Sequence, residues 1–348
     1  MQKSTLLTAT CLLMCVLLSI LTAFSDASLS GTSSEAYALA HASASKNEVK
    51  IASFNIQIFG SSKMEKKNVL AVILKILSRY DLVLIQEVRD SSDTAFANLV
   101  KELSNYNKNV KYGSAISERL GRSNSKEQYG FIYNTDKVKM IKTVQFKDTK
   151  GWFERPPFAF VFELNAAKLK GQQFAILGCH IKPGDVVNEL NHLVEVYDSF
   201  KSEPFYKNII LTGDFNADCS YLSDTEMKKL KLSTDARFKW LIDMDSTVAD
   251  SECSYDRYIV PVELSAKKLS SGALYELGQA TVYRYDKDMK ITDEELVEDV
   301  SDHYPIEMTI TSSQNIGLSS KTLADLVFDD LVKEEGEDDW RRINMNPY

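Results

Sequence analysis

Several polar side chains in the middle of the chain stand at, or just after, the end of an apolar run. His180, for example, ends the sequence Phe-Ala-Ile-Leu-Gly-Cys-His. In α/β proteins the ends of buried strands meet at one edge of a sheet, where ligands bind. The residues that share this position are Asn55, Glu87, His180, Asp214, Asn216, Asp256, Asp302 and His303. We take them as the candidate functional residues.

These side chains suit the hydrolysis of a phosphodiester. Hard divalent cations prefer oxygen ligands, which Asn55, Glu87, Asp214, Asn216 and Asp302 can supply. An attacking water also needs a base, and the leaving oxygen needs an acid. Imidazole titrates near neutral pH, so His180 and His303 are the natural candidates. Each needs a carboxylate to hold its tautomer, and the sequence leaves open which histidine is acid and which is base.

The elements that must position these residues alternate between strands and helices. Alternating, β-branched or wholly apolar runs predict strands at residues 49–59, 82–85, 131–133, 159–164, 174–177 and 208–211. Apolar residues at helical spacing predict helices at residues 68–78, 96–103 and 190–200. This order predicts a layered α/β fold rather than an all-helical or all-β one. His192 falls inside the third helix, where a packing or surface role is expected.

The two ends of the chain differ from its middle. Lys3 precedes an apolar stretch at residues 6–24, followed by small polar residues, which is the order of a secretory signal peptide. An uncleaved anchor is the alternative, because the stretch approaches the ~20 residues that span a bilayer. We expect a signal peptide at 1–27, a flexible arm at 28–48, one domain at 49–311 and an acidic tail at 312–348. The protein is then secreted through the endoplasmic reticulum, with no membrane span after cleavage.

Composition excludes some classes of protein. With 26% charged and 44% hydrophobic residues the chain is an ordinary globular one, and its net charge of −8 excludes coating of nucleic acid by bulk positive charge. Residues 321–348 hold eight acidic and four basic residues, so half of that charge lies in the tail. Three of the five cysteines lie beyond the signal peptide. In an oxidising compartment they predict one disulfide and one free thiol.

Five segments together resemble deoxyribonuclease I, in the right order, across residues 49–311. They lie at residues 50–56, 84–90, 213–221, 253–257 and 301–305, and residues 120–122 and 126–129 add to the resemblance. Gly-Asp-Phe-Asn alone would indicate only the wider endonuclease, exonuclease and phosphatase superfamily. The resemblance implies a four-layer α/β sandwich, with two central, mostly antiparallel or mixed β-sheets flanked by helices. It also implies cleavage of double-stranded DNA with little sequence specificity, leaving a 5′-phosphate and a 3′-hydroxyl.

The resemblance also implies roles for individual residues. Glu127 pairs with His180 and Asp256 with His303 as acid and base. Asn55, Glu87, Asp214, Asn216 and Asp302 bind Mg²⁺ or Mn²⁺ and the scissile phosphate. Arg89 enters the minor groove, and Arg155 and Asn216 contact DNA near the phosphate. Cys219 and Cys253 form the disulfide, and Cys179 is left as a buried thiol.

Some of the family's features are not matched. The loop at residues 147–153 lacks a second cysteine pair, so the calcium site associated with that loop is not carried over. A second Ca²⁺ site is matched in part by Asp245 and Thr247. Ser125 replaces a tyrosine that contacts DNA. Ser114-Ala115-Ile116 lacks the aromatic residue of the actin-binding form, so actin binding is not expected, and we expect a monomer.

Two other functions remain open. The first is another phosphodiesterase of the superfamily, acting on a lipid or an inositol phosphate. The paired cysteines and the sequence Gln-Glu-Val-Arg-Asp at residues 86–90 weigh against it. The second is a secreted DNA-binding protein that has lost catalysis. That reading predicts loss of the histidines or the metal-binding carboxylates, and all of them are present.

Overall fold

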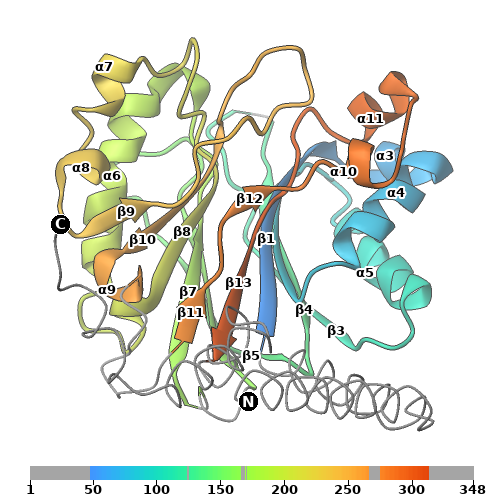
Figure 1. Ribbon diagram of the computed structural model, residues 1–348, viewed down its shortest axis with the longest axis horizontal. Helices are drawn as coiled ribbons and strands as arrows, with labels where there is room; N and C mark the ends of the chain where they lie inside the picture. The colour runs from blue at the N-terminus through green and yellow to red at the C-terminus, as the bar shows by residue number, and fades with distance from the viewer. Residues whose placement is uncertain (1–47, 124, 166–168, 170, 266–274, 313–348) are drawn as a thin grey trace, which may run out of the picture. The chain divides into compact units, whose positions relative to one another are not determined.

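The computed structural model describes residues 48–312, except residues 124, 166–168, 170 and 266–274 (Figure 1). The expected signal peptide, the arm up to residue 47 and the tail from residue 313 lie outside the described residues. Within the described part, the first strand begins at Glu48 and the last ends at Ser312. None of the helices described has the length and apolarity needed to cross a bilayer.

The first β-sheet has seven strands in the order β11-β13-β1-β2-β4-β3, with β12 beside β13. Its strands are β1 (Glu48–Phe59), β2 (Leu82–Val88), β3 (Tyr112–Ile116), β4 (Gln128–Asn134), β11 (Tyr275–Leu277), β12 (Thr281–Val282) and β13 (Ile306–Ser312). Only β1 and β2 pair in parallel, and the other neighbours are antiparallel. The sheet is therefore mixed.

The second sheet has six strands in the order β5-β6-β7-β8-β10-β9. Its strands are β5 (Val138–Gln145), β6 (Phe158–Leu164), β7 (Gln173–Gly178), β8 (Ile209–Asp214), β9 (Phe238–Trp240) and β10 (Asp256–Pro261). Here too a single central pair, β7 and β8, is parallel. Each sheet thus has one parallel pair near its middle.

Helices cover the outer face of each sheet (Figure 1). Beside the first sheet lie α3 (Ser61–Glu65), α4 (Lys67–Leu77), α5 (Ala95–Tyr106), α10 (Tyr285–Asp288) and α11 (Glu294–Val300). Beside the second lie α6 (Val186–Ser199), α7 (Asp224–Met227), α8 (Lys231–Thr234) and α9 (Val262–Ser265). Two short 3₁₀ turns occur at Pro183–Asp185 and Tyr206–Asn208. The predicted four-layer α/β sandwich is confirmed.

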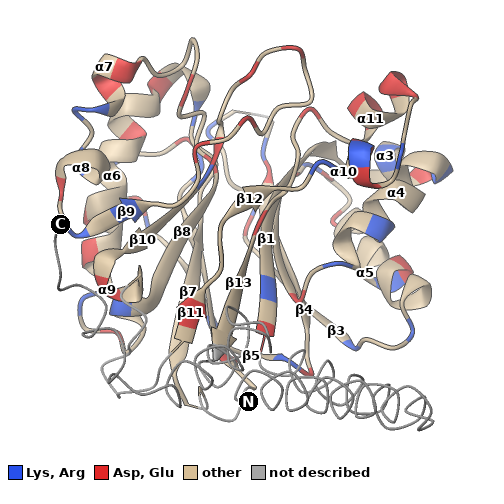
Figure 2. Cartoon of the chain, viewed as in Figure 1, with Lys and Arg blue, Asp and Glu red and all other residues tan. Residues whose placement is uncertain are grey.

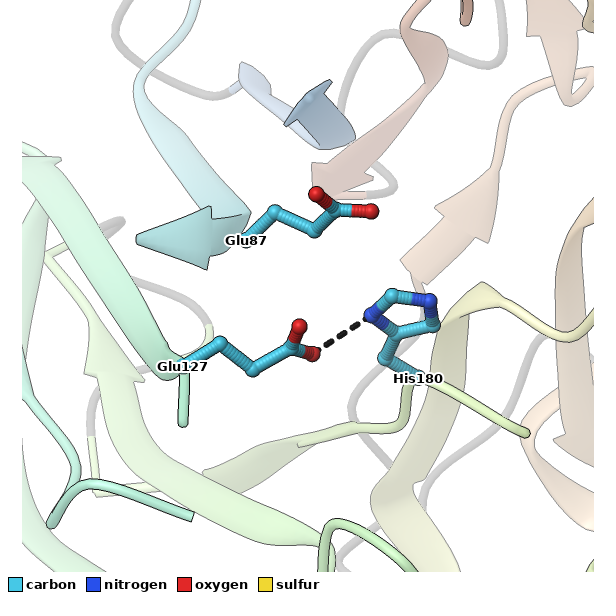
Figure 3. Close-up of side chains that lie close together, drawn as sticks. All are labelled: Glu87, Glu127 and His180. Carbon is cyan, nitrogen blue, oxygen red and sulfur yellow. Dashed lines mark hydrogen bonds and ion pairs between the residues drawn. The ribbon is translucent and has the colours of Figure 1, made fainter. Parts of the chain in front are cut away.

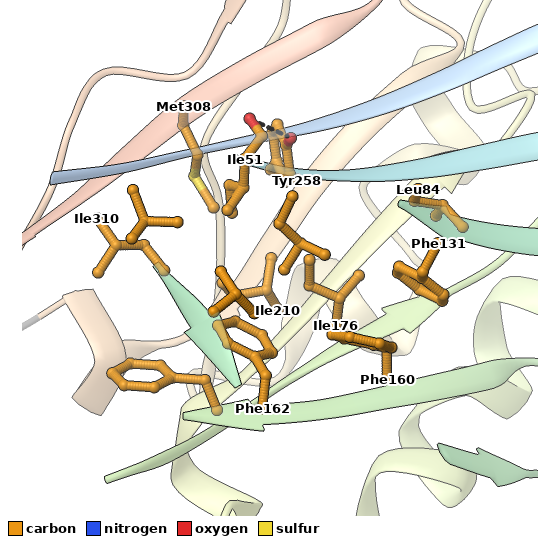
Figure 4. Packing of buried hydrophobic residues seen from close by; sticks show 14 of the residues in the cluster. Ile51, Leu84, Phe131, Phe160, Phe162, Ile176, Ile210, Tyr258, Met308 and Ile310 are labelled. Atoms are coloured by element: carbon orange, nitrogen blue, oxygen red, sulfur yellow. Dashed lines mark hydrogen bonds between the residues drawn. The ribbon is translucent and has the colours of Figure 1, made fainter. Parts of the chain in front are cut away.

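The core between the two sheets holds the layers together. Phe131 of β4 stacks on Phe160 of β6 with ring centroids 4.8 Å apart, and Ile176 and Ile210 face Ile51 and its neighbours across the same space (Figure 4). Two further apolar clusters lie outside this one, between each sheet and its helices. Burial of so many large apolar side chains is the main favourable term for such a fold.

The two parallel strand pairs place the candidate functional residues at one edge of the sandwich. In a parallel pair both strands end at the same edge, and Asn55 and Glu87 stand at that end of β1 and β2. His180 and Asp214 stand at the corresponding end of β7 and β8. A hydrogen bond from Asn55 to Asp214 then joins the two sheets. The candidate residues of both sheets therefore meet at this edge.

Candidate active site

The first pair of catalytic candidates joins His180 to Glu127. Nδ1 of His180 lies 2.6 Å from Oε1 of Glu127, and both side chains are buried. Arg155 braces the pair, because its Nε lies 3.1 Å from Glu127 Oε1 and donates to the His180 carbonyl at 3.1 Å. Figure 3 shows the Glu127 carboxylate pointing at the His180 ring, with the Glu87 side chain beside them.

Charges set the protonation of this pair. Burial alone would lower the pKa of His180, but the Glu127 carboxylate, with help from Asp214, outweighs it and raises the pKa above its ordinary value. Burial alone would raise the pKa of Glu127, yet His180 and Arg155 hold that pKa below its usual range. The pair therefore favours a carboxylate beside an imidazolium, whose Nε2 carries a proton that it can donate.

The second pair joins His303 to Asp256 in the same way. Nδ1 of His303 lies 2.7 Å from Oδ2 of Asp256. Ser246 supports the carboxylate by donating its hydroxyl to that oxygen at 2.8 Å. Burial alone would lower the pKa of His303, but the Asp256 and Asp214 carboxylates raise it to about 10. Both histidines thus use Nδ1 to hold a carboxylate and leave Nε2 for chemistry.

Asp214 lies between the two pairs. Its Oδ2 is 3.5 Å from Nε2 of His180 and 3.5 Å from Nε2 of His303. The two Nε2 atoms therefore approach the same carboxylate oxygen. The backbone at this point needs glycine, since Gly213 has φ 140° and a Cβ there would lie 2.0 Å from the Cys179 carbonyl oxygen. That close approach sets the β8 end directly against the segment that carries His180.

Oxygen donors surround this centre. The Asn55 amide nitrogen donates to Asp214 Oδ2 at 3.1 Å and to Glu87 Oε1 at 3.3 Å. Glu87 has φ 59° and Asn216 has φ 47°, a left-handed conformation that is uncommon outside glycine and concentrates at functional sites. Asp302 is half exposed, with its Oδ1 3.8 Å from Nε2 of His303. The set is rich in hard oxygen ligands.

These groups fit a divalent cation. Two groups of potential ligands, Glu87–Glu127–His180 and Asp214–Asp256–His303, each have their ligand atoms within 4.8 Å of one another. The Asp214 and Asp256 side chains are almost fully buried. Burying several carboxylates together is costly unless positive charge is supplied. Mg²⁺, Mn²⁺ and Ca²⁺ all prefer such oxygen donors.

The arginines predicted to contact DNA occupy different positions. Arg89 is partly exposed, and its Nη1 lies 3.7 Å from Oε2 of Glu87, so it stands at the rim of the site. Arg155 is mostly buried against Glu127 and the His180 backbone. Asn216 uses its amide nitrogen to donate to the Ile181 carbonyl at 2.9 Å. The side chains of Arg155 and Asn216 thus contribute to the framework of the site.

The two residues predicted for a structural Ca²⁺ lie in one loop. Asp245 Oδ1 accepts from the backbone N–H and the hydroxyl of Thr247, at 2.9 Å and 2.7 Å. It also accepts from the backbone N–H of Cys253 at 3.1 Å. Thr247 forms an isolated β-bridge with His303, so the loop is joined to the backbone of the His303–Asp256 pair.

Cys219 and Cys253 form a disulfide, and Cys179 is a buried free cysteine. The bridge has a sequence separation of 34 residues and links the segment after β8 to the segment before β10.

Replacing both bridged cysteines by serine should lower the free energy of unfolding by roughly 3–4 kcal/mol, since the unfolded chain loses its cross-link. Urea denaturation measures this, with Cys179→Ala as the control for loss of a sulfur outside the bridge. An unchanged double-variant stability would contradict the assignment.

Several supporting residues were not identified from the sequence. Gln86, fully buried, donates to the Cys179 carbonyl at 2.9 Å and accepts from the Asp214 backbone N–H at 3.0 Å. The Tyr129 hydroxyl accepts from the His180 backbone N–H at 2.7 Å. Gln86 directly follows the apolar run of β2. A polar residue that continues a buried strand must find partners inside the protein, and that signal could have identified it.

Comparison with known proteins agrees with this fold. Residues 52–303 match the model of the Endonuclease/Exonuclease/phosphatase family. Deoxyribonuclease-1 of Bos taurus is 36% identical over 270 residues, which cover 76% of this chain and 92% of that protein. Deoxyribonuclease gamma of Homo sapiens is 36% identical over 283 residues, covering 79% and 90%. Among solved structures, an endonuclease/exonuclease/phosphatase family protein from Leptotrichia buccalis has a TM-score of 0.51 at 18% identity, covering 75% of this chain and 99% of that one.

The layered fold and the paired histidines and carboxylates define a hydrolase of the endonuclease/exonuclease/phosphatase superfamily. Within that superfamily the chain belongs to the deoxyribonuclease I family, as its identity to these relatives over most of its length shows. It is an enzyme of the deoxyribonuclease I type. The predicted family is confirmed.

Proposed function

We propose that the protein is a secreted, divalent-metal-dependent endonuclease that hydrolyses the phosphodiester bonds of double-stranded DNA with little sequence specificity. One observation carries the proposal: the Nε2 atoms of two histidines, each held by a buried carboxylate, approach the same Asp214 oxygen at 3.5 Å. A phosphodiester placed there meets a proton acceptor on one side and a proton donor on the other.

The reaction follows from this geometry. One of the two histidines, His180 or His303, acts in its neutral form and takes a proton from water on Nε2 as the water oxygen attacks phosphorus. The other histidine gives a proton to the 3′-oxygen as the bond from phosphorus to that oxygen breaks. The products are a 5′-phosphate and a 3′-hydroxyl. Glu127 and Asp256 orient the two rings and stabilise their charged forms.

A divalent cation supplies charge stabilisation for the phosphate oxygens when it is bound. We assign its ligands to Asn55, Glu87, Asp214, Asn216 and Asp302, and we propose Mg²⁺ or Mn²⁺ as the ion. The Asn55 amide nitrogen between Glu87 and Asp214 supports this set, because it brings both carboxylates to one point. We propose that Ca²⁺ binds at the loop of Asp245 and Thr247.

DNA recognition is proposed to rest on few residues. Arg89 stands beside Glu87 at the rim and would reach into the minor groove, while Arg155 and Asn216 would contact the phosphate region. The minor groove displays a degenerate pattern of donors and acceptors, which accounts for weak sequence preference. We propose that the protein acts as a monomer and does not bind actin.

The proposed location is extracellular. A disulfide within the catalytic domain suits an oxidising compartment, and the N-terminal residues have the order of a signal peptide. The proposed layout is a signal peptide at 1–27, an arm at 28–48, a catalytic domain at 49–311 and an acidic tail at 312–348. Sequencing the N-terminus of the secreted protein would test the first boundary.

Nicking of supercoiled plasmid DNA tests the function directly. We expect no nicking in EDTA, nicking with Mg²⁺ or Mn²⁺, and faster nicking with Mg²⁺ plus Ca²⁺. The nicks should be sealed by DNA ligase without further processing, because the ends are 5′-phosphate and 3′-hydroxyl.

The same preparation should be assayed on a phospholipid and an inositol phosphate. Hydrolysis of either one beside intact DNA would replace the proposed function with another phosphodiesterase activity. DNA that is bound but never cut, under every metal condition, would identify a catalytically inactive binding protein.

A further inference from the structure

One lysine outside the predicted site reaches its framework. Lys63 lies in α3 and its Nζ donates to the carbonyl of Ile56 at 2.8 Å. The same nitrogen donates to the carbonyl of Val300 at 3.0 Å. Ile56 follows Asn55 directly, and Val300 ends α11 just before Ser301 and Asp302. Lys63 therefore joins two distant segments that both carry proposed metal ligands.

These segments need such a connection because the sheet no longer holds them together. The pairing of β1 with β13 ends at Ser53 and Ile306, so Asn55 and Asp302 lie beyond the ladder. The Ser301 hydroxyl makes one further link by donating to the Asn55 carbonyl at 2.7 Å. It also accepts from the His303 backbone N–H at 3.1 Å. Lys63 makes the second link at the neighbouring residue of each segment, Ile56 after Asn55 and Val300 before Ser301.

The surroundings of Lys63 suit a cation held close to the site. Burial lowers the pKa of Lys63 to about 8, and the Asp302, Glu87 and Asp299 carboxylates act in the opposite direction. Figure 2 shows the acidic residues that gather on α11, near α3. Placing a lysine in a largely buried position is costly, and anchoring a five-residue helix does not by itself require an ammonium group.

We propose that Lys63 is a positioning residue for the divalent cation. By holding the Ile56 and Val300 carbonyls it fixes the separation of Asn55 from Asp302, and its charge reduces the repulsion between Asp302 and Glu87. The inference rests on the proposed function, because it assumes that these residues bind the metal. Residues that orient metal ligands typically contribute 10–100-fold to metal affinity or activity.

The test uses the full-length mature protein and Mn²⁺ as the probe. Lys63→Met keeps the length of the side chain but removes the charge and both donors. We expect it to weaken Mn²⁺ binding, measured by electron paramagnetic resonance without DNA, by roughly 10–100-fold. The kcat of plasmid nicking should fall in parallel, while KM for DNA stays unchanged. Lys63→Arg, which keeps the charge and can donate to both carbonyls, should recover most of both losses.

Lys66→Met is the matched control. Lys66 directly follows α3, and its half-exposed side chain places Nζ 2.7 Å from Asp299 Oδ1, so this variant removes the same charge but leaves the Ile56 and Val300 carbonyls with their donor. It should bind Mn²⁺ like the wild type. Equal losses in both variants, or wild-type Mn²⁺ affinity in folded Lys63→Met, would overturn the inference.

The two proposals fail in different ways. A purely structural role for Lys63 would lower the melting temperature in EDTA without changing the Mn²⁺ affinity of the folded protein, which also overturns the inference. If the wild type binds Mn²⁺ in a manner that depends on Lys63 but never nicks DNA, the proposed function fails and the positioning role stands. If the wild type nicks DNA and Lys63→Met nicks it equally well, the proposed function stands and the positioning role of Lys63 fails.

Discussion

Replacing His303 by alanine should slow DNA cleavage by about 10²–10⁴-fold, and replacing His180 should do the same, because each loses one proton-transfer partner. The His303 ring is held by Asp256 at 2.7 Å and the His180 ring by Glu127 at 2.6 Å. Water or a neighbouring carboxylate cannot take over at the same geometry. The loss should appear in kcat, since the histidines are proposed to act on the reacting atoms and not on distant parts of the DNA.

The carboxylate partners allow a sharper version of this experiment. Asp256→Asn in the wild type should also lower kcat, because the amide no longer stabilises the imidazolium. In a His303→Ala background the same change should cost little more, since residues that act as one unit are not additive. Full additivity of the two losses would show that Asp256 does not act through His303.

His192 provides a matched control within the same chain. It lies on α6, where its ring stacks on Trp152 with centroids 4.3 Å apart, and it belongs to neither catalytic pair. His192→Ala should leave kcat unchanged in the folded protein. A wild-type rate in either His180→Ala or His303→Ala, or a loss of similar size in His192→Ala, would refute the assignment.

The elements that position these residues could be predicted where the pattern is local. The apolar spacing in residues 68–78 predicts the helix observed as α4, Lys67–Leu77. The predicted helix at 190–200 corresponds to α6, Val186–Ser199. Short or weakly patterned elements were missed, among them β5, Val138–Gln145, whose residues after Val138 are exposed or only partly buried. An edge strand with little burial leaves a weak periodic signal.

The partners within the site could be predicted only in part. Strand-end polar residues identify His180 and Asp214, because burial of the run before them is visible in the sequence. Glu127 follows no apolar run and was found only through the resemblance. The contact of Lys63 with Val300 joins residues 237 positions apart. Such a contact depends on how α3 and α11 are packed in three dimensions, and no local pattern contains that information.

The second large effect is expected at Asp214, where the two histidine–carboxylate pairs meet. Asp214→Asn should lower kcat by more than roughly 100-fold, because even groups that only orient metal ligands are worth 10–100-fold. The substitution keeps the shape of the side chain and removes the charge that faces both Nε2 atoms. Mn²⁺ binding should weaken in the same variant, since a neutral amide is a poorer ligand than a carboxylate for a hard cation.

The same variant makes a prediction about the histidines in the absence of metal. The Asp214 carboxylate helps to raise the pKa of both His180 and His303. In EDTA, Asp214→Asn should therefore lower both pKa values, as measured by NMR titration of the ring protons. Asp218→Asn is the control from the same loop, since Asp218 accepts from the backbone N–H groups of Cys219 and Ser254. Unchanged histidine titrations in Asp214→Asn would show that Asp214 does not couple the two pairs.

The raised pKa of His303 also predicts how the stability of the protein depends on pH. The pKa of His303 is raised to about 10 in the folded protein, against about 6.5 for an unfolded chain. The stabilisation from its protonated form is therefore fully present below about pH 6.5 and is lost as the pH rises through the folded value. In EDTA the wild type should lose this stabilisation as the pH rises from about 6.5 to about 10. In Asp214→Asn the stabilisation should be smaller, and it should be lost at lower pH. Urea denaturation across this range measures both curves, and identical pH dependence would mean that the two histidines titrate independently of the carboxylate between them.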